Sequence, residues 1–180
     1  MTFDRLIVGG LETNCYILKS EGNGIIIDPG AEPERILQKC EGLKIELILA
    51  THNHFDHISA LNAVKEKTGA KAAIHPLDWT DGFDLRLEDG KRIRLGPDEI
   101  LCLHTPGHTP GGVCFLVRTD LFSGDTLFLG GPGNTAFPGG DERAIYKSIR
   151  EKLIVLSDDT KVHPGHGPST TIGTERRLYC

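Results

Sequence analysis

One histidine-rich segment, directly after an apolar run, constrains this fold more than any other part of the chain. Residues 45–51 fit a strongly apolar strand, and His52, His54, Asp56 and His57 follow it. Three histidines and one aspartate within six positions are hard to explain by packing, so they predict a metal site. The strand should therefore end at a sheet edge that further ligands can reach.

Three more potential ligands each follow an apolar stretch and a glycine. They are His108, Asp125 and His166. Because strand ends converge on one edge of a sheet, we expect all seven side chains to meet there. Seven donors are enough for two metal ions.

The spacing within the first segment indicates how two ions would be held. In an extended chain, His52 and His54 leave the same face and can share one ion. Asp56 and His57 come where the chain turns into a helix, so we expect them to point towards a second ion. Imidazole and carboxylate donors suit zinc, and also iron or manganese. Without thiolates in the set, a catalytic centre is favoured over a closed structural zinc site.

The remaining histidines and one early aspartate are interpreted as structural. His75 ends a short predicted strand, and His104 and His163 are interpreted as structural residues or as residues that support the ligands from behind. Asp28, in Asp-Pro-Gly, is interpreted as a turn residue rather than a ligand.

The order of apolar runs and turn signals predicts one α/β or α+β layered domain spanning residues 1–180. The Gly/Pro-rich stretch 130–140 is expected to form a loop over the site. Expected strands are residues 14–18, 24–28, 45–51, 71–75, 100–103, 113–118, 121–123 and 160–163, with shorter fragments around Ile93 and Leu95. Expected helices are residues 33–41, residues 58–68 ending at Gly69, and a segment from Asp141 with Ile145, Ile149, Leu153 and Leu156 on one face.

Composition excludes several classes of function. A net charge of −5 and a pI near 5.9 argue against a nucleic-acid-binding surface. No apolar run reaches membrane-spanning length, and the first ten residues lack a signal-peptide pattern, so we expect a cytoplasmic protein. Its partner should be a small molecule; the sequence does not indicate an oligomeric state. The five cysteines are interpreted as small buried residues of a protein in a reducing compartment: Cys15, Cys40, Cys102, Cys114 and Cys180. The sequence leaves open whether any two of them form a disulfide.

Four motifs resemble those of the metallo-β-lactamase superfamily. They are His-x-His-x-Asp-His at 52–57, Thr-Pro-Gly-His-Thr-Pro-Gly at 105–111, Gly-Asp-Thr-Leu-Phe at 124–128 and Pro-Gly-His-Gly at 164–167. The resemblance covers nearly the whole chain and is strongest to glyoxalase II-like hydrolases. It implies an α+β fold, the αββα four-layer sandwich, with the site at one edge of the two sheets.

The resemblance also implies roles for the seven residues. His52, His54 and His108 would hold a first metal, Asp56, His57 and His166 a second, and Asp125 would bridge them. A hydroxide between two divalent ions, zinc in the first place, would attack a thioester such as S-lactoylglutathione. Asp56 would be catalytic as well as a ligand, because it would orient the hydroxide and take its proton.

Departures from the glyoxalase II pattern affect glutathione recognition rather than catalysis. The additional C-terminal helical region of that family is not present in this sequence. Asn134 and Ala136 stand where the family places a Lys and a Tyr, and Pro168 stands in place of another Tyr. Hydrolysis of hydroxyacylglutathione nevertheless remains open, because shorter relatives also lack this region.

Other functions on the same scaffold are weighed against the thioester hydrolase. The main alternative is a single-iron oxygenase of the persulfide dioxygenase type. Lactam hydrolysis is disfavoured because Asp125 stands where zinc β-lactamases usually use Cys. A nuclease is disfavoured because the sequence has no room for the extra domain that nucleases of the superfamily insert. A non-enzymatic binding module is disfavoured because such proteins usually lose metal ligands, and all seven are present here.

Overall fold

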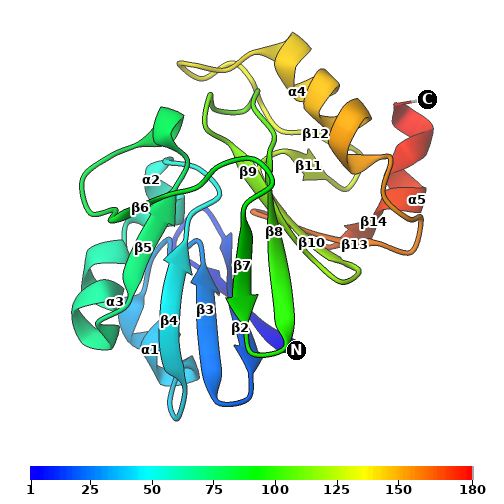
Figure 1. The fold of residues 1–180 in the computed structure, drawn as a ribbon. Helices are drawn as coiled ribbons and strands as arrows, with labels where there is room; N and C mark the ends of the chain where they lie inside the picture. Colours follow the sequence, from blue (N-terminus) through cyan, green and yellow to red (C-terminus); the bar gives the residue numbers. More distant parts are fainter. Residues whose placement is uncertain (180) are drawn as a thin grey trace.

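Two six-stranded mixed sheets pack face to face in the computed structural model, which describes residues 1–179 (Figure 1). The first sheet begins with antiparallel strands and continues with parallel ones, in the order β1-β2-β3-β4-β5-β6. Its strands are β1 (Thr2–Val8), β2 (Thr13–Ser20), β3 (Asn23–Ile27), β4 (Lys44–Leu49), β5 (Lys71–Ile74) and β6 (Leu85–Arg86).

The second sheet is formed by the later part of the chain, in the order β14-β13-β10-β9-β8-β7. Only its β10–β13 pair is parallel. Its strands are β7 (Arg92–Leu95), β8 (Asp98–His104), β9 (Val113–Val117), β10 (Asp120–Gly124), β13 (Lys161–Pro164) and β14 (Thr170–Thr171), and a separate small hairpin joins β11 (Leu127–Phe128) to β12 (Gly131–Pro132).

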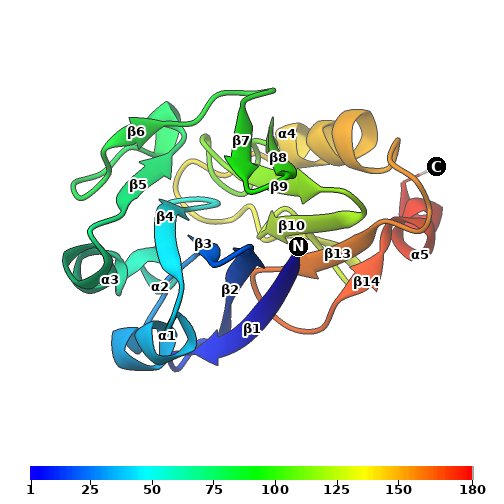
Figure 2. The same cartoon turned by 60° about the horizontal axis from the view of Figure 1, so that its bottom comes forward.

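Helices cover the two outer faces of this sandwich (Figure 2). One side carries α1 and α3, and the other carries α4 and α5. The expected α+β, αββα four-layer sandwich is therefore confirmed. The helices are α1 (Pro33–Lys39), α2 (Phe55–Ile58), α3 (Leu61–Thr68), α4 (Glu142–Ser148) with a π-helical continuation (Ile149–Leu153), and α5 (Ile172–Glu175); short 3₁₀ turns span Pro76–Asp78 and Arg176–Leu178.

The three consecutive isoleucines of β3 show why the chain forms layers. Side chains alternate along a strand, so Ile26 faces one side and its neighbours face the other. Ile26 packs with Ile36 of α1 in the outer apolar layer. Ile25 and Ile27 pack in the layer between the sheets, together with Phe115 of β9. A strand that is apolar on both faces must be covered on both faces, which is what the sandwich provides.

Several elements differ from those predicted by the sequence. Strand β1 has no predicted counterpart, because it is an edge strand in which only Leu6 and Val8 of seven side chains are buried. The helix expected over 58–68 is two helices, and Ala60 N–H between them donates to the Pro29 carbonyl at 3.0 Å. The last long helix leaves α-helical geometry after Ser148 and does not include Leu156. The loop at 130–140 contains the short strand β12.

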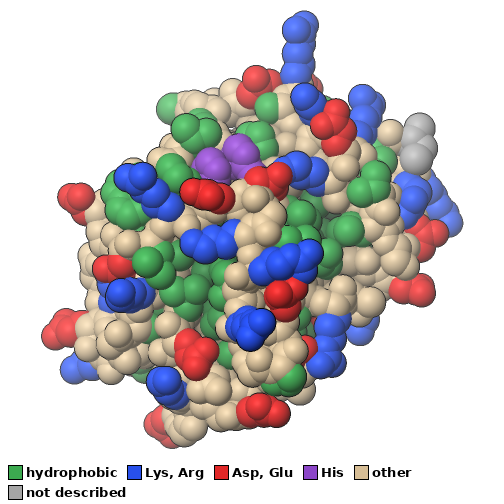
Figure 3. All heavy atoms as spheres, in the orientation of Figure 1, with side chains coloured by type: hydrophobic (Ala, Val, Ile, Leu, Met, Phe, Trp, Pro, Cys, Tyr) green, Lys and Arg blue, Asp and Glu red, His purple; other side chains and the backbone are tan. Residues whose placement is uncertain are grey.

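Charged side chains of both signs are mixed across the face drawn in Figure 3. That distribution agrees with the acidic net charge and differs from the basic stripe of nucleic-acid-binding proteins. Among residues 1–179, no helix has the length and apolar character needed to span a bilayer.

Candidate metal centre

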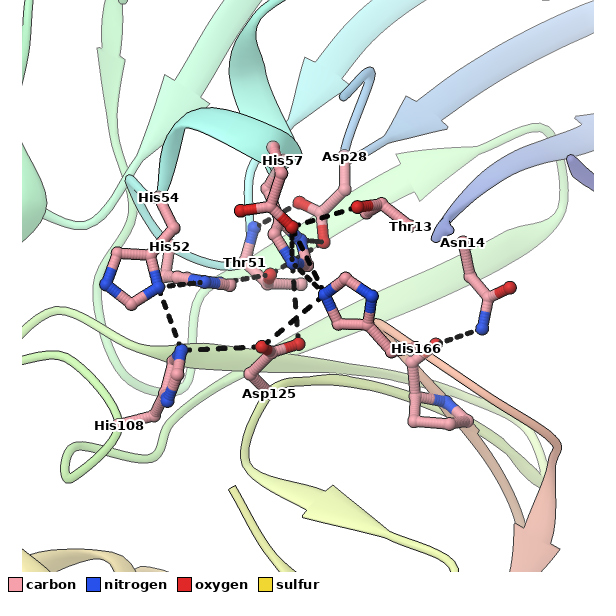
Figure 4. Close-up of polar contacts among 12 residues, drawn as sticks. Thr13, Asn14, Asp28, Thr51, His52, His54, His57, His108, Asp125 and His166 are labelled. Carbon is pink, nitrogen blue, oxygen red and sulfur yellow. Dashed lines mark hydrogen bonds and ion pairs between the residues drawn. The ribbon is translucent and has the colours of Figure 1, made fainter. Parts of the chain in front are cut away.

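The seven predicted side chains meet at one edge of the sandwich, as the close-up in Figure 4 shows for most of them. His52 and His54 follow β4, and Asp56 and His57 lie in α2. His108 comes from the β8–β9 connection, Asp125 directly follows β10, and His166 follows β13. Each side chain reaches the site because a strand delivers the chain to this edge.

The first group of donors consists of His52, His54 and His108. His52 Nε2 lies 3.1 Å from His54 Nδ1, and His108 Nε2 lies 2.9 Å from the same atom. One hydrogen on His54 Nδ1 can serve only one of these contacts. The three nitrogens therefore converge on a space that a cation would fill.

The second group consists of Asp56, His57 and His166. His166 Nε2 lies 3.2 Å from Asp56 Oδ2 and 3.3 Å from His57 Nε2. His57 Nε2 lies 3.5 Å from Asp56 Oδ2. Donors bonded to one zinc at about 2.0–2.1 Å with tetrahedral angles are roughly 3.3–3.4 Å apart, so these separations suit one ion.

Asp125 lies between the two groups. Its Oδ2 is 3.4 Å from His108 Nε2 and 3.7 Å from His166 Nε2, and its Oδ1 is 3.4 Å from His57 Nε2. The Oδ1 atom is buried and has no hydrogen-bond partner among the described residues. A buried carboxylate oxygen without a donor is costly, and a metal ion would satisfy it.

Outer hydrogen bonds fix which nitrogen of each imidazole faces the centre. His108 Nδ1 lies 2.6 Å from the Asn134 carbonyl, and His166 Nδ1 lies 2.9 Å from the Leu11 carbonyl. A carbonyl can only accept, so both Nδ1 atoms carry hydrogen and both neutral rings turn a lone pair inwards at Nε2. His57 has the same arrangement, because its Nδ1 lies 2.9 Å from Asp28 Oδ2. The inward lone pairs of His57 and His166 then require a proton or a metal ion between them.

Asp28 does more than its predicted role in a turn. It is 1% exposed and left-handed, with φ of 53°. Its Oδ1 accepts from Thr51 N–H, and its Oδ2 accepts from Thr51 Oγ1, both at 2.7 Å. Thr51 Oγ1 in turn lies 3.0 Å from His52 Nδ1. One buried carboxylate thus orients His57 directly and His52 through a hydroxyl.

Two glycines allow the backbone segments of the site to approach closely. A Cβ on Gly30 would lie 1.7 Å from the Asp56 carbonyl oxygen. A Cβ on Gly165 would lie 2.2 Å from Asp125 Oδ1 and 2.6 Å from His57 Cε1. Any larger residue at either position would push ligands apart.

The electrostatics of the site favour the metal-binding form of His52, His54 and Asp56 and oppose it at His57. Burial, followed by the charge of neighbouring histidines, lowers the pKa of His52 and His54, which favours neutral imidazoles. Burial alone would raise the pKa of Asp56, but hydrogen bonding with His166 and the charge of His57 hold it well below its ordinary value. For His57, burial opposes protonation, yet Asp28 raises the pKa to about 9. In the metal-free protein a proton therefore competes for His57.

The three histidines that are interpreted as structural make their contacts with residues other than the seven donors. His75 and His104 stack on each other with ring centroids 4.0 Å apart. His163 Nε2 lies 2.8 Å from Asp120 Oδ1. These contacts give the rings a packing role at some remove from the seven donors.

Sequence reasoning missed the residues that support the ligands. Asp28 and Thr51 had a usable signal, because both end strongly apolar strands at the same sheet edge. Thr13 Oγ1 donates to Asp56 Oδ2 at 2.9 Å. Thr13 begins a strand instead of ending one, so the rule that ligands follow strands does not find it. Leu11 and Asn134 act through their carbonyls, for which the residue type carries no signal.

An open hollow of about 540 Å³ exposes the centre to solvent. It is lined by five of the seven donors and by apolar side chains from two loops and the start of α2. The donors are His54, Asp56, His108, Asp125 and His166, and the apolar side chains are Leu11, Phe55, Phe137 and Pro138. A small molecule can therefore reach the donor atoms.

Comparison with known proteins gives a family that agrees with this geometry. The metallo-beta-lactamase superfamily model matches residues 8–166, which include all seven donors. The hydroxyacylglutathione hydrolase GloC of Haemophilus influenzae is 34% identical over 98% of this chain and 96% of its own length.

Two solved structures of similar length share the fold. The crystal structure of BLEG-1 B3 metallo-beta-lactamase has a TM-score of 0.90 and 33% identity, covering 98% of this chain and 97% of that one. TTHA1623 in a di-iron-bound form has a TM-score of 0.85 and 36% identity, covering 97% of both chains. The His/Asp cluster and the relatives support a metal-binding hydrolase, and the predicted likeness to hydroxyacylglutathione hydrolases is confirmed. The chain belongs to the metallo-β-lactamase superfamily.

Proposed function

We propose that this protein is a dinuclear metal-dependent hydrolase of a small thioester. The observation that carries the proposal is a pair of three-donor groups that share Asp125. His52, His54 and His108 form one group, and Asp56, His57 and His166 form the other. A single ion would leave one group and its buried polar atoms without a partner.

Two bound divalent ions would lower the pKa of a shared water to about 7 and polarise the substrate carbonyl. Nitrogen and carboxylate donors suit zinc first, with iron or manganese as the alternatives. TTHA1623, which was solved in a di-iron-bound form, supports iron as one of these alternatives.

Asp56 is the residue we assign to proton handling. Its Oδ2 is held by the Thr13 hydroxyl at 2.9 Å, and the side chain also lines the open hollow. An ionised carboxylate at this position can orient water and accept its proton. Hydrolysis then joins the water oxygen to the acyl carbon, the carbon–sulfur bond breaks, and the sulfur leaves with the electron pair. Since a thiolate is a good leaving group, a separate general acid is not required.

The compartment and partner are part of the same proposal. The four described cysteines are buried and unpaired, which suits a reducing cytoplasm. We propose a small-molecule substrate rather than a nucleic acid or a membrane, because the site is a hollow of limited size with acidic and apolar walls.

The direct test is a thioester panel with metal content measured on the same sample. S-Lactoylglutathione, acyl thioesters of other thiols and a β-lactam should be included. We expect thioester hydrolysis with two ions per chain, and D56A should abolish it while the protein stays folded. D159A, at an exposed aspartate, is the matched control. Turnover of the β-lactam alone, or full activity of D56A, would overturn the proposal.

A single-iron oxygenase is the second candidate. The structure groups His52, His57 and Asp125 as a set of two histidines and one carboxylate, the donor set of many non-haem iron oxygenases. Metal analysis that finds one iron per chain, together with oxygen uptake on glutathione persulfide and no thioester hydrolysis, would favour the oxygenase over the hydrolase.

A further inference from the structure

Three large apolar side chains are exposed around the donor atoms. Leu11 is 55% exposed, Phe55 is 69% exposed and Phe137 is 49% exposed. They come from the β1–β2 loop, the start of α2 and the loop before α4, which are distant in sequence. Exposed apolar side chains that converge on one hollow indicate a binding surface rather than chance exposure.

Phe137 carries this apolar wall up to the ligands themselves. Its ring centroid lies 5.3 Å from that of His54 and 6.1 Å from that of His108, in edge-to-face geometry. Pro138 lines the hollow beside it. A substrate group bound near His54 and His108 must therefore lie against an aromatic face.

A second hollow, of about 420 Å³, lies against the same side chains. Leu11, Phe55 and Asp56 line both hollows. The rest of the second hollow is formed mainly by small residues: Val8, Gly9, Gly10, Gly30 and Ala31, with Thr13 and Ser59. Leu11 and Phe55 thus form a ridge between two hollows, and Asp56 is accessible from each.

Neither hollow is lined by lysine or arginine among the described residues. The charged lining residues are Asp56 and Asp125, which already belong to the two donor groups. Beside the second hollow, Glu32 accepts from Gly9 N–H and forms an ion pair with Arg35, so both side chains are occupied. Apart from the metal ions of the proposed function, a carboxylate carried by the substrate would find no cationic side chain on these walls.

Building on the proposed thioester hydrolysis, we infer that the substrates are thioesters with two uncharged, apolar arms. A thioester extends in two directions from its carbonyl–sulfur unit, and the structure provides one apolar hollow on each side of the Leu11–Phe55 ridge. The acyl arm lies in one hollow and the thiol arm in the other. The site selects against glutathione, whose two carboxylates would be desolvated without a partner.

The first test compares two thioesters that carry the same acyl group, one on N-acetylcysteamine and one on glutathione. We expect kcat/KM to favour the neutral thiol by about tenfold or more, since an unpaired charge is poorly tolerated on an apolar wall. Equal or better turnover of the glutathione ester would overturn the inference.

A binding measurement separates this inference from the proposed function. Non-hydrolysable thioether analogues of the same two esters can be titrated by calorimetry. Tighter binding of the neutral thioether supports the inference even if no thioester is hydrolysed, in which case only the proposed reaction fails. Tighter binding of the glutathione thioether overturns the inference whether or not hydrolysis occurs.

Substitutions test each hollow in turn. F137A and L11A should lower kcat/KM for apolar substrates by about tenfold, and much less for a short acetyl ester. G10L should fill the second hollow without disturbing the backbone, because a Cβ on Gly10 meets nothing within 4 Å. It should shorten the longest arm accepted on one side of the thioester only. L178A is the matched control, because Leu178 is 56% exposed and lines neither hollow.

Unchanged arm-length preference in G10L, with metal content and melting temperature intact, would overturn the two-arm arrangement. An equal loss in L178A and L11A would show that the effect of L11A is not specific to the hollow.

Discussion

The two halves of the sandwich supply the metal centre in different ways. The half built on the first sheet contributes four donors from one short segment, His52 to His57. The half built on the second sheet contributes His108, Asp125 and His166 from three separate connections. Support differs as well. In the first half the Asp28 side chain holds ligands (Figure 4), whereas His108 and His166 are held by the backbone carbonyls of Asn134 and Leu11.

Because the ligands are supported differently, metal binding should respond differently to substitutions in the two halves. A ligand held by a side chain depends on the type of the supporting residue. A ligand held by a carbonyl depends only on the path of the loop. Metal binding should therefore be sensitive to mutation around the first segment and tolerant around the ligands of the second half, with Asp125 as the exception that joins them.

The largest effect is expected for D125A. The Asp125 carboxylate lies 3.4 Å from His108 Nε2 of the first group and 3.4 Å from His57 Nε2 of the second, so its loss should weaken both ions at once. Activity should fall by more than the roughly 10–100-fold that is typical when a residue hydrogen-bonded to a metal ligand is mutated. Metal content per chain and hydrolysis rate on the same sample measure this, with D81A at an exposed aspartate as the control. Retention of two ions at wild-type affinity would break the idea that this residue joins the halves.

A smaller effect is expected for D28A. Removing this carboxylate leaves His57 Nδ1 and the Thr51 hydroxyl without their acceptor. Metal affinity should fall by about 10–100-fold, as for other partners of ligating histidines. Chelator competition gives the affinity, and melting of the metal-free protein shows whether the fold itself is affected. Unchanged affinity would mean that the first half does not depend on side-chain support.

The smallest effect is expected for N134A, at the equivalent supporting position in the second half. His108 Nδ1 bonds to the main-chain carbonyl of Asn134, which the substitution retains. Only the bond from Ala136 N–H to the Asn134 side chain is lost. Metal affinity should change by about 0.5 kcal/mol or less, roughly twofold. The same chelator competition applies, and a loss as large as that of D28A would remove the contrast between the halves.

Much of the layered fold was accessible from the sequence because its strands are apolar. The isoleucines at 25–27 predict a strand, and the structure shows that this strand is covered on both faces. Strand β1 could not be found in this way, since it lies at a sheet edge and only two of its seven side chains, Leu6 and Val8, are buried. The break between α2 and α3 was also hidden, because it follows from a tertiary hydrogen bond to Pro29.

The donors of the site were accessible for a different reason. His52 and its neighbours are concentrated in one segment, and each remaining donor follows a strand and a glycine. What surrounds them was not accessible. The carbonyls of Leu11 and Asn134 serve as acceptors whatever their side chains are, and Phe137 reaches the site only through the path of its loop. Periodicity and composition carry no information about such paths.

The contacts that close the site also determine when it can form during folding. Asn14 Nδ2 and Tyr16 Oη, at the start of the chain, both donate to the Pro164 carbonyl near its end. Thr13 and His166 form an isolated bridge beside them. Contacts of such long sequence separation form slowly, because the intervening chain must first be ordered. We therefore expect the centre to be completed late in folding, because the second group of donors joins Asp56 and His57 to His166, which lies 109 residues beyond His57.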